Sequence, residues 1–462
     1  MSRYVEAIDI AYAGGALAPK PRVAILGDSI TAQNVLTATG SVQTSARGYW
    51  TWADILTGKR FTFDPINDNY GLAGDALVAY SSYPGIPSRV ANIIASGARI
   101  CVVLAGSNDI AIAGTSHAAM IAAMRDSVLL PLQQAGIVPI VLTVLPRGAT
   151  GGGGLTSAQT KQLYRFNRWL MELGHGRADL MGALLYPPIV VDVTPYLLDN
   201  TSSVANPVTF MMLSDYTHPT QRAAYIVGRE LAAVLNRIYP PRANAWASAL
   251  DMYDATYNPS GSRAVQSGTN NVGTFAWTGG SLITNAGLTP SGVLAFGLSA
   301  FRSRGSSTAT MALSKENPRT DGPVTGERQL VKVSISSAGD PSFETYTLQL
   351  GSNVSVTAGE QFYLQVNYEL MTVPQGLLGV EARLYTGGGG VDQTVSDGMI
   401  DTAVAQAPIY EEVHSGVLKT PILTAAVSNT AMNIQLNLHM KAANSSTAEI
   451  AWSDMQIVPV GS

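Results

Sequence analysis

Short, predominantly apolar runs alternate with helical patterns over the first half of the chain. The apolar runs cover residues 23–26, 100–105, 137–145 and 189–193. Each run is bounded by turn residues, which is typical of strands buried in a parallel sheet. The helical patterns between them cover residues 48–56, 87–96, 117–136, 157–173 and 220–238. This alternation predicts an α/β domain with a flavodoxin-like three-layer parallel sheet over residues 22–240.

The helical pattern disappears beyond residue 250. Runs in which apolar and polar residues alternate take its place, at residues 331–336, 345–350, 362–366, 433–440 and 448–458. They are separated by Gly, Asn, Ser and Pro turns and predict an all-β sandwich over residues 251–462. The end of the chain resembles the last strand of the jelly-roll modules attached to carbohydrate-active enzymes. We interpret residues 241–250 as a linker and residues 1–21 as an N-terminal approach segment.

Length and composition agree with two domains. The chain has 462 residues, which is more than one hydrophobic core usually serves. Its net charge of −4 comes without a basic run, so nucleic acid is not an expected partner. Cys101 is the only cysteine and lies in an apolar run, which predicts a buried thiol and no internal disulfide.

The sequence contains no long apolar segment and no N-terminal leader pattern. We therefore expect no membrane span and no cleaved secretion signal. These expectations leave a cytoplasmic enzyme, a leaderless secreted protein, or a virion or phage-tail protein that acts outside the cell. Phage-tail proteins are often oligomeric, so a homo-oligomer is one possible state.

A candidate nucleophile follows the first apolar run. Gly27 ends that run, and Ser29 then lies at the carboxyl end of the predicted sheet, where open α/β folds place their sites. Serine is also a favoured N-cap residue, so capping of the next helix is the alternative role for Ser29. His218 is a suitable base to activate a serine, and Asp215 lies three residues before it, close enough to orient the imidazole.

Four sequence blocks carry a family resemblance. They are Gly-Asp-Ser-Ile-Thr at 27–31, Asn-Tyr-Gly-Leu-Ala-Gly-Asp at 69–75, Gly-Ser-Asn-Asp at 106–109 and Asp-Tyr-Thr-His-Pro at 215–219. In this order they resemble the blocks of the SGNH, or GDSL-like, serine hydrolase superfamily. The resemblance covers roughly residues 20–240 and implies the flavodoxin-like fold. It also implies a catalytic triad of Ser29, Asp215 and His218 that works through an acyl-enzyme intermediate.

The resemblance further implies an oxyanion hole. Its donors are the backbone N–H groups of Ser29 and Gly74 and the side-chain amide of Asn108. We expect Asp28 and Asp109 to hold backbone turns. His117 and His175 lack a partner at such a spacing and are expected to be structural or exposed. No His, Cys or Glu cluster has the spacing of metal ligands, so we expect neither a metal nor a cofactor.

Three functions remain open. The first is a serine esterase that removes acyl groups, most readily O-acetyl, from a carbohydrate, while the β domain binds or presents the glycan. A lipase, thioesterase or polyester hydrolase is the second, and the apolar segment 194–214 would form part of its substrate wall. A catalytically silent virion or surface adhesin is the third, although the intact set of five site residues argues against it. Candidate glycan platforms in the β domain are Tyr253, Tyr257, Trp277, Tyr346, Tyr363, Tyr385 and Trp452, and burial in the sandwich is the alternative for each.

Overall fold

The computed structural model describes most of the chain. The described ranges are 20–36, 42–148, 154–201, 206–208, 211–240, 280–285, 287–294, 298–316, 328–338, 343–387, 393–398, 412–426 and 430–460. None of the helices in these ranges is long and apolar enough to cross a membrane. The chain divides into two compact units. One comprises Met1–Val35, Gly48–Asp54 and Arg60–Tyr239, and the other comprises Leu36–Arg47, Ile55–Lys59 and Pro240–Ser462.

A five-stranded parallel sheet forms the centre of the first unit. Its strands are β1 (Val23–Gly27), β4 (Asn69–Gly71), β5 (Ile100–Leu104), β6 (Val138–Leu142) and β7 (Ile189–Val191). They lie in the order β4-β1-β5-β6-β7. Counted along the chain this is the order 2-1-3-4-5, which is the flavodoxin-like order. The predicted parallel sheet is therefore confirmed.

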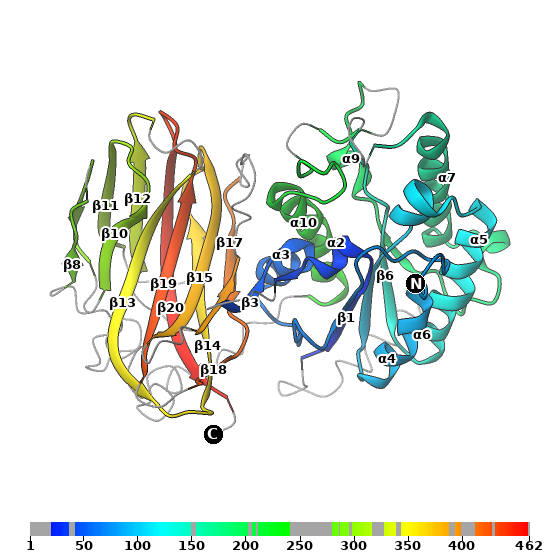
Figure 1. Ribbon diagram of the computed structural model, residues 1–462, viewed down its shortest axis with the longest axis horizontal. Helices are drawn as coiled ribbons and strands as arrows, with labels where there is room; N and C mark the ends of the chain where they lie inside the picture. Colours follow the sequence, from blue (N-terminus) through cyan, green and yellow to red (C-terminus); the bar gives the residue numbers. More distant parts are fainter. Residues whose placement is uncertain are drawn as a thin grey trace. The chain divides into compact units, whose positions relative to one another are not determined.

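Helices cover both faces of this sheet (Figure 1). Because side chains alternate along a strand, Val23 and Ile25 of β1 belong to one core cluster, and Ala24 and Leu26 belong to the other. All four side chains are fully buried. The first cluster includes α3 (Gly48–Leu56) and α10 (Gln221–Ile238), and the second includes α4 (Val90–Ala95), α5 (His117–Ala122), α6 (Leu130–Gln134) and α7 (Ser157–Gly174). The sheet thus has a hydrophobic core on each side.

The helix ends differ in detail from the sequence prediction. The stretch 117–136 is helical, but a π-helical segment, η4 (Ala123–Leu129), separates α5 from α6. Pro131 lies in the first turn of α6, where its missing N–H is not needed. The sequence favours Ser157 as the N-cap of the helix that follows, but Thr156 is the N-cap of α7, in a capping box with Gln159. The remaining short helices are α2 (Ser29–Ala32), η2 (Ile86–Arg89), η3 (Asp109–Ala113), α8 (Ala178–Met181) and α9 (Thr194–Leu197).

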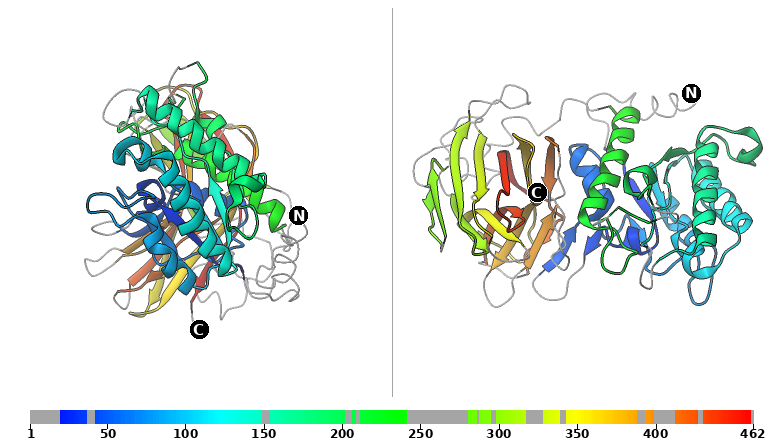
Figure 2. Two further views of the ribbon diagram at one scale, coloured as in Figure 1. Left: turned by 90° about the vertical axis from the view of Figure 1, so that its right-hand side faces the viewer. Right: turned by 90° about the horizontal axis from the view of Figure 1, so that it is seen from above.

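The second unit is built from two mixed β-sheets (Figures 1 and 2). The eight-stranded sheet contains β2 (Val35–Leu36), β3 (Val42–Ala46), β16 (Gln393–Asp397), β15 (Leu377–Gly387), β19 (Thr430–Met440), β13 (Glu344–Val356), β10 (Leu298–Arg304) and β8 (Ser281–Leu282). The seven-stranded sheet contains β17 (Ser415–Lys419), β14 (Gln361–Leu370), β20 (Thr447–Pro459), β12 (Arg328–Ile335), β11 (Ala309–Glu316) and β9 (Leu288–Gly292), with β18 (Leu423–Thr424) on β14. In β12, Val331, Val333 and Ile335 are buried while Lys332 is exposed, so the predicted alternation places one side of the strand in the core.

Two strands of the eight-stranded sheet, β2 and β3, come from the first half of the chain. Residues of β3 pair in parallel with β16, about 350 positions further along. A buried ion pair of 2.9 Å between Lys59 Nζ and Asp397 Oδ2 joins the same two parts of the sequence. The second unit therefore contains residues 36–47 and 55–59, which the sequence prediction placed in the α/β domain. The linker 241–250 and residues 1–19 lie outside the described ranges. A fragment that ends near residue 244 would leave β3 without its neighbour, so tests of function require the full chain.

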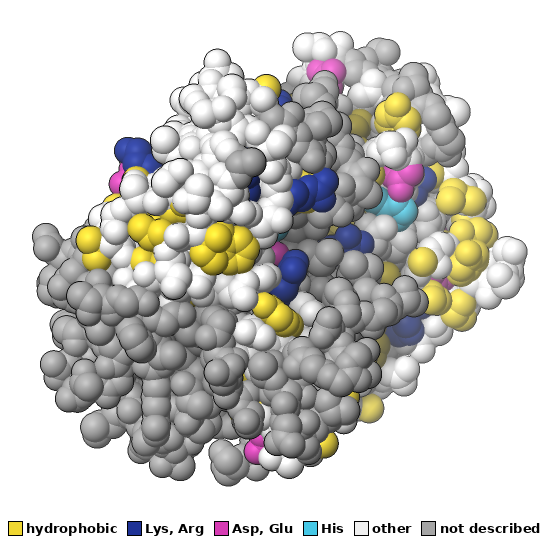
Figure 3. Space-filling view, turned by 60° about the vertical axis from the view of Figure 1, so that its left-hand side comes forward, with side chains coloured by type: hydrophobic (Ala, Val, Ile, Leu, Met, Phe, Trp, Pro, Cys, Tyr) yellow, Lys and Arg dark blue, Asp and Glu magenta, His cyan; other side chains and the backbone are white. Residues whose placement is uncertain are grey.

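Apolar side chains on the surface are scattered. Exposed large apolar residues include Ile66, Ile112, Leu185, Val373 and Ile422, which belong to different parts of the chain. On the face shown in Figure 3, the described apolar side chains lie in separate groups with polar side chains between them. Such isolated exposed residues are ordinary on protein surfaces.

The stability of the second unit is expected to decrease as the pH falls from about 6.5 to about 4. Burial lowers the pKa of His414 from 6.5 to about 4, and Tyr368 Oη lies 3.0 Å from its Nε2. The unfolded chain therefore binds a proton in this pH window that the folded unit does not bind, and this difference favours unfolding. Thermal unfolding of the wild type and of His414→Gln between pH 4 and 7 measures the effect. We expect a smaller pH dependence for the variant, and identical dependences would contradict this role of His414.

Candidate active site

Ser29 begins the short helix α2, immediately after β1. A Cβ at Gly27 would lie 2.3 Å from the carbonyl oxygen of Leu104, so the close approach of β1 and β5 requires glycine there. Asp28 is the N-cap of α2, because its side chain accepts a hydrogen bond of 2.9 Å from the N–H of Ile30. Asp28 therefore caps the helix, which was the alternative role that we considered for Ser29. The partly exposed Ser29 hydroxyl contacts His218 instead.

Ser29, His218 and Asp215 form a chain of hydrogen bonds. Ser29 Oγ lies 2.8 Å from His218 Nε2, and His218 Nδ1 lies 2.5 Å from Asp215 Oδ2. The other carboxylate oxygen of Asp215 accepts hydrogen bonds from the backbone N–H groups of Thr217 and His218, at 2.9 and 3.0 Å. Burial opposes ionisation of Asp215, but these bonds outweigh it and hold its pKa below the usual value. The carboxylate is thus charged and fixes the orientation of the imidazole.

The order of the strands places this chain of hydrogen bonds at a point of the sheet that is favourable for ligand binding. The order reverses between β1 and β5, and open α/β folds bind ligands at the carboxyl ends of the strands at such a point. Ser29 follows β1 and Asn108 follows β5, so the two residues flank this switch point. Asp215 and His218 precede α10 and reach the same end of the sheet through the contact with Ser29.

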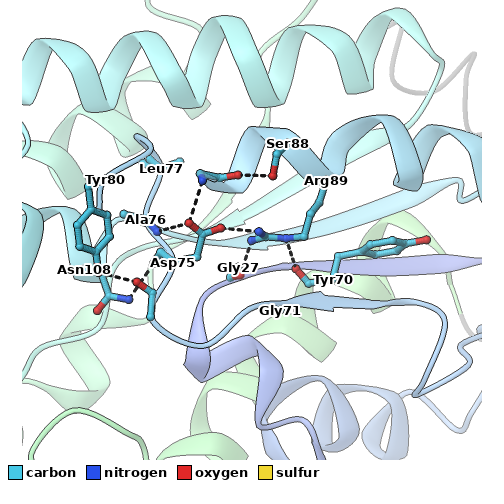
Figure 4. Close-up of polar contacts among 12 residues, drawn as sticks. Gly27, Tyr70, Gly71, Asp75, Ala76, Leu77, Tyr80, Ser88, Arg89 and Asn108 are labelled. Atoms are coloured by element: carbon cyan, nitrogen blue, oxygen red, sulfur yellow. Dashed lines mark hydrogen bonds and ion pairs between the residues drawn. The ribbon is translucent and has the colours of Figure 1, made fainter. Parts of the chain in front are cut away.

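Gly74 and Asn108 are connected through Asp75, whose contact with Asn108 is drawn in Figure 4. Asn108 Nδ2 donates a hydrogen bond of 2.8 Å to the backbone carbonyl oxygen of Asp75. Gly74 has a φ of +82°, and a Cβ on it would lie 2.4 Å from the Tyr83 hydroxyl, so this turn requires glycine. The Tyr80 hydroxyl donates a bond of 2.6 Å to the carbonyl oxygen of Gly74. The turn that carries Gly74 is therefore fixed to the segment that carries Asn108.

Asp75 and Arg89 hold the same turn to the ends of two strands (Figure 4). The fully buried Asp75 carboxylate accepts bonds from the backbone N–H groups of Ala76 and Gly85, at 2.9 and 3.0 Å, and forms an ion pair with Arg89. Arg89 also donates bonds of 3.0 Å to the carbonyl oxygens of Gly27 at the end of β1 and Tyr70 in β4. One guanidinium group thus joins the segments that carry Ser29 and Gly74.

Two further aspartates hold backbone segments, as the sequence analysis expected. Asp28 caps α2, and Asp109 accepts bonds of 2.7 and 3.2 Å from the backbone N–H groups of Leu77 and Val78. Burial raises the pKa of both groups, and that of Asp28 reaches about 6. The charges of Arg147 and His218 limit the rise at Asp28. Both carboxylates therefore contribute to the architecture beneath the site.

Other residues singled out from the sequence lie elsewhere. His117 packs against Phe166, and burial lowers its pKa. His175 is exposed at the C-cap of α7. Cys101 is fully buried, which raises the pKa of its thiol. The structural roles expected for these residues agree with their positions, and none of them contacts Ser29 within the described residues.

The segment 194–214 was expected to contribute a substrate wall. Three of its described apolar residues, Leu197, Met211 and Met212, are buried in the core cluster on the α3 and α10 side of the sheet. Tyr196 and Val208 are exposed, and Phe210 lies outside the described residues. Ordinary packing, which the sequence left as the alternative, therefore accounts for the three buried residues, and a substrate wall stays a prediction for the rest.

Four residues of the site were not singled out by sequence reasoning: Asp75, Tyr80, Arg89 and Arg147. Asp75 closes one of the four blocks, and Arg147 follows the apolar run of β6, so their positions at the carboxyl ends of strands were the available signal. Tyr80 and Arg89 carry no comparable signal. No group of three or more His, Cys, Asp or Glu residues that could hold a metal ion occurs in the described ranges.

Comparison with known proteins gives likenesses at the level of structure. No protein-family model matches the sequence, and no curated protein matches it. An acetyl esterase structure is similar over 47% of this chain and 97% of its own, at 16% identity and a TM-score of 0.32. A carbohydrate esterase family 3 structure from Talaromyces cellulolyticus is similar over 48% and 100%, at 15% identity and a TM-score of 0.31. A GDSL-like lipase from Bacteroides thetaiotaomicron is similar over 51% and 98%, at 14% identity and a TM-score of 0.35.

All three likenesses are distant, with identities of 14–16%, whereas the topology of this chain is specific. The 2-1-3-4-5 order of parallel strands is the one that the sequence resemblance implied. The first block begins at the last residue of β1, the second begins with β4, the third follows β5 and the fourth precedes α10. Side chains of the first and last blocks meet in one chain of hydrogen bonds. The first unit of this protein has an SGNH-like hydrolase fold.

Proposed function

We propose that this protein is a serine carboxylic ester hydrolase that removes O-acetyl groups from a carbohydrate. The observation that carries the proposal is the continuous chain from Ser29 Oγ through His218 to the charged Asp215. A serine hydroxyl becomes a good nucleophile when a positioned base takes its proton, and this chain supplies the base and its orienting group. The partly exposed Ser29 remains accessible to a substrate.

The reaction would proceed through an acyl-enzyme. His218 Nε2 takes the proton of Ser29 as Oγ attacks the ester carbonyl carbon, and the carbonyl oxygen becomes negatively charged. The backbone N–H groups of Ser29 and Gly74 and the amide of Asn108 are the proposed donors to this oxygen. Collapse of the tetrahedral intermediate breaks the ester bond, and His218 gives the proton to the leaving sugar hydroxyl. Water then repeats the sequence on acetyl-Ser29 and releases acetate.

The packing around the site favours a short acyl group. Leu197, Met211 and Met212 are buried in the core, so these three apolar side chains of segment 194–214 are not available to line a site for a long acyl chain, whereas Tyr196 and Val208 are exposed. The side chains that hold the turns of Gly74 and Asn108 are polar, namely Tyr80, Asp75 and Arg147. This setting supports an acetyl ester over the esters of a lipase.

The carbohydrate part of the proposal rests on the second unit, which we propose to be a jelly-roll-like sandwich that binds or presents a glycan. Of its candidate platforms, Tyr346 and Trp452 are buried in the core. Tyr363 and Tyr385 are partly exposed, and the ammonium group of Lys419 lies 4.1 Å from the ring centre of Tyr363. The described candidates for stacking on a sugar are therefore Tyr363 and Tyr385. Tyr253, Tyr257 and Trp277 lie outside the described residues.

A panel of esters tests the proposal with the full chain. We expect kcat/KM for p-nitrophenyl esters to fall at least about tenfold from acetate to octanoate, because one misfitting methylene costs about 1–3 kcal/mol in a restricted site. We also expect acetate release from at least one acetylated polysaccharide, measured against a heat-inactivated control. A preference for long acyl chains would favour the lipase alternative. A folded protein that hydrolyses no ester would favour the silent adhesin.

A further inference from the structure

Arg147 is a buried cation with an unusual set of contacts. It follows β6, and only 4% of its surface is exposed. Its Nε donates a hydrogen bond of 3.0 Å to Ser107 Oγ, and its Nη2 donates one of 2.9 Å to Asn108 Oδ1. None of the ion pairs within 4.0 Å that link described residues includes Arg147. Among the described residues, the guanidinium group therefore makes its hydrogen bonds to Ser107 and Asn108 and to no carboxylate, while the charges of Asp28 and Asp215 act on it from further away.

The Asn108 side chain has a carbonyl oxygen and two N–H groups, and the oxygen and one N–H have hydrogen-bond partners. Arginine only donates, so the atom that faces Arg147 must be the carbonyl oxygen of the amide. Nδ2 then points the other way, and one of its two N–H groups donates to the carbonyl oxygen of Asp75 at 2.8 Å. The second N–H has no partner among the described residues. This is the N–H that the proposed reaction requires for the developing oxyanion.

We propose that Arg147 is a positioning residue that fixes the orientation of the Asn108 amide and strengthens its remaining N–H as a donor to the oxyanion. A charge-assisted hydrogen bond to the amide oxygen withdraws electron density from the amide nitrogen, and linked hydrogen bonds polarise one another in a buried site. The same bond prevents the amide from rotating by 180°, which would present an oxygen to the negatively charged intermediate. The inference rests on the proposed esterase function.

The energetics of Arg147 distinguish this role from a structural one. Burial of a guanidinium group without a counter-ion is unfavourable, and it lowers the pKa of Arg147 even though the charges of Asp28 and Asp215 act in the opposite direction. Arg89 offers the contrast, because its charge is paired with Asp75 and its other bonds join β1 and β4. Loss of Arg147 should therefore affect the reaction more than the fold, and loss of Arg89 should affect the fold.

The test compares Arg147→Met, Arg147→Lys and the matched control Arg89→Met in the full chain. For a soluble acetyl ester, we expect Arg147→Met to lower kcat by about 10- to 100-fold with little change in KM, since a lost oxyanion donor costs about 10²–10³-fold in kcat. Its Tm should stay within about 2 °C of the wild type, whereas Arg89→Met should lower Tm by several degrees. Arg147→Lys keeps the positive charge and can donate a hydrogen bond to Asn108 Oδ1, so it should recover part of kcat.

A double-variant comparison tests whether Arg147 acts through Asn108. Asn108→Ala should lower kcat by about 10²–10³-fold, and adding Arg147→Met should then change kcat little. Multiplicative effects of the two changes would overturn the inference, and so would an Arg147→Met enzyme as active as the wild type. A fall in Tm as large as that of Arg89→Met would also overturn it, because the role would then be structural. Failure of the proposed function itself would be seen separately, as a wild-type protein inactive on every ester.

Discussion

Replacement of Ser29 by alanine is expected to lower kcat for a soluble acetyl ester by at least about 10⁴-fold and to leave Tm unchanged. The hydroxyl contacts His218 at 2.8 Å and does not cap α2, because Asp28 does so. The change therefore removes the proposed nucleophile, and serine hydrolases that lose their nucleophile retain only the catalysis of binding and the oxyanion hole. Measurements of kcat and thermal unfolding on the same preparation check both parts of the expectation.

Ser116→Ala is a matched control for the loss of a serine hydroxyl. Ser116 is the N-cap of α5, and its Oγ accepts a hydrogen bond of 3.3 Å from the N–H of Ala119. Loss of such a cap costs about 1 kcal/mol of stability, so this variant should show a lower Tm and ordinary activity. An active, folded Ser29→Ala protein would refute the proposed nucleophile. A Ser29→Ala protein with the lower Tm expected of Ser116→Ala would indicate that Ser29 acts in the fold.

Replacement of His218 by alanine is expected to lower kcat by a similar factor, at least about 10⁴-fold. His218 is the only residue that contacts both Ser29 Oγ and a carboxylate of the site in the described ranges, through Nε2 at 2.8 Å and Nδ1 at 2.5 Å. Without it, the Ser29 hydroxyl has no base to take its proton. Steady-state kinetics on a soluble acetyl ester measure the loss.

His175→Ala is the matched control, because His175 is exposed at the end of α7. We expect this variant to retain wild-type kcat. His117→Ala should also stay active, since His117 packs against Phe166. If either variant lost as much activity as His218→Ala, a different histidine would be the base. Asp215→Asn should keep the fold and lower kcat, because the neutral amide no longer stabilises the charged imidazole.

Local patterns were sufficient to predict most of the first unit. Four of its five strands are short apolar runs, and the alternation with helices allows few arrangements of a parallel sheet. The fifth strand, β4, is the short segment Asn69–Gly71 and is not an apolar run. The spacing of Asp215 and His218 in front of a helix also has a local meaning, because one turn brings the two side chains together. Errors occurred where neighbouring residues are equivalent, as with Thr156 and Ser157, both of which are good N-cap residues.

Features that depend on distant contacts could not be predicted in this way. The pairing of β3 with β16 joins residues about 350 positions apart, and nothing in residues 42–46 specifies that partner. Arg147 lies 39 residues from Asn108, and an arginine after a strand is more often exposed than buried beside an amide. The ion pair of Asp75 and Arg89 is a similar case, since neither residue alone indicates that one guanidinium group joins the ends of β1 and β4.

Covalent labelling tests the central claim, that Ser29 is a nucleophile activated by His218, most directly. The full chain is treated with a fluorophosphonate probe, which forms a bond to the oxygen of an activated serine with loss of fluoride, and the site of labelling is mapped by peptide mass spectrometry. The account predicts one label, on the peptide that contains Ser29, with no label on Ser29→Ala and strongly reduced labelling of His218→Ala. Equal labelling of Ser29→Ala, or a label on another serine of the wild type, would contradict it.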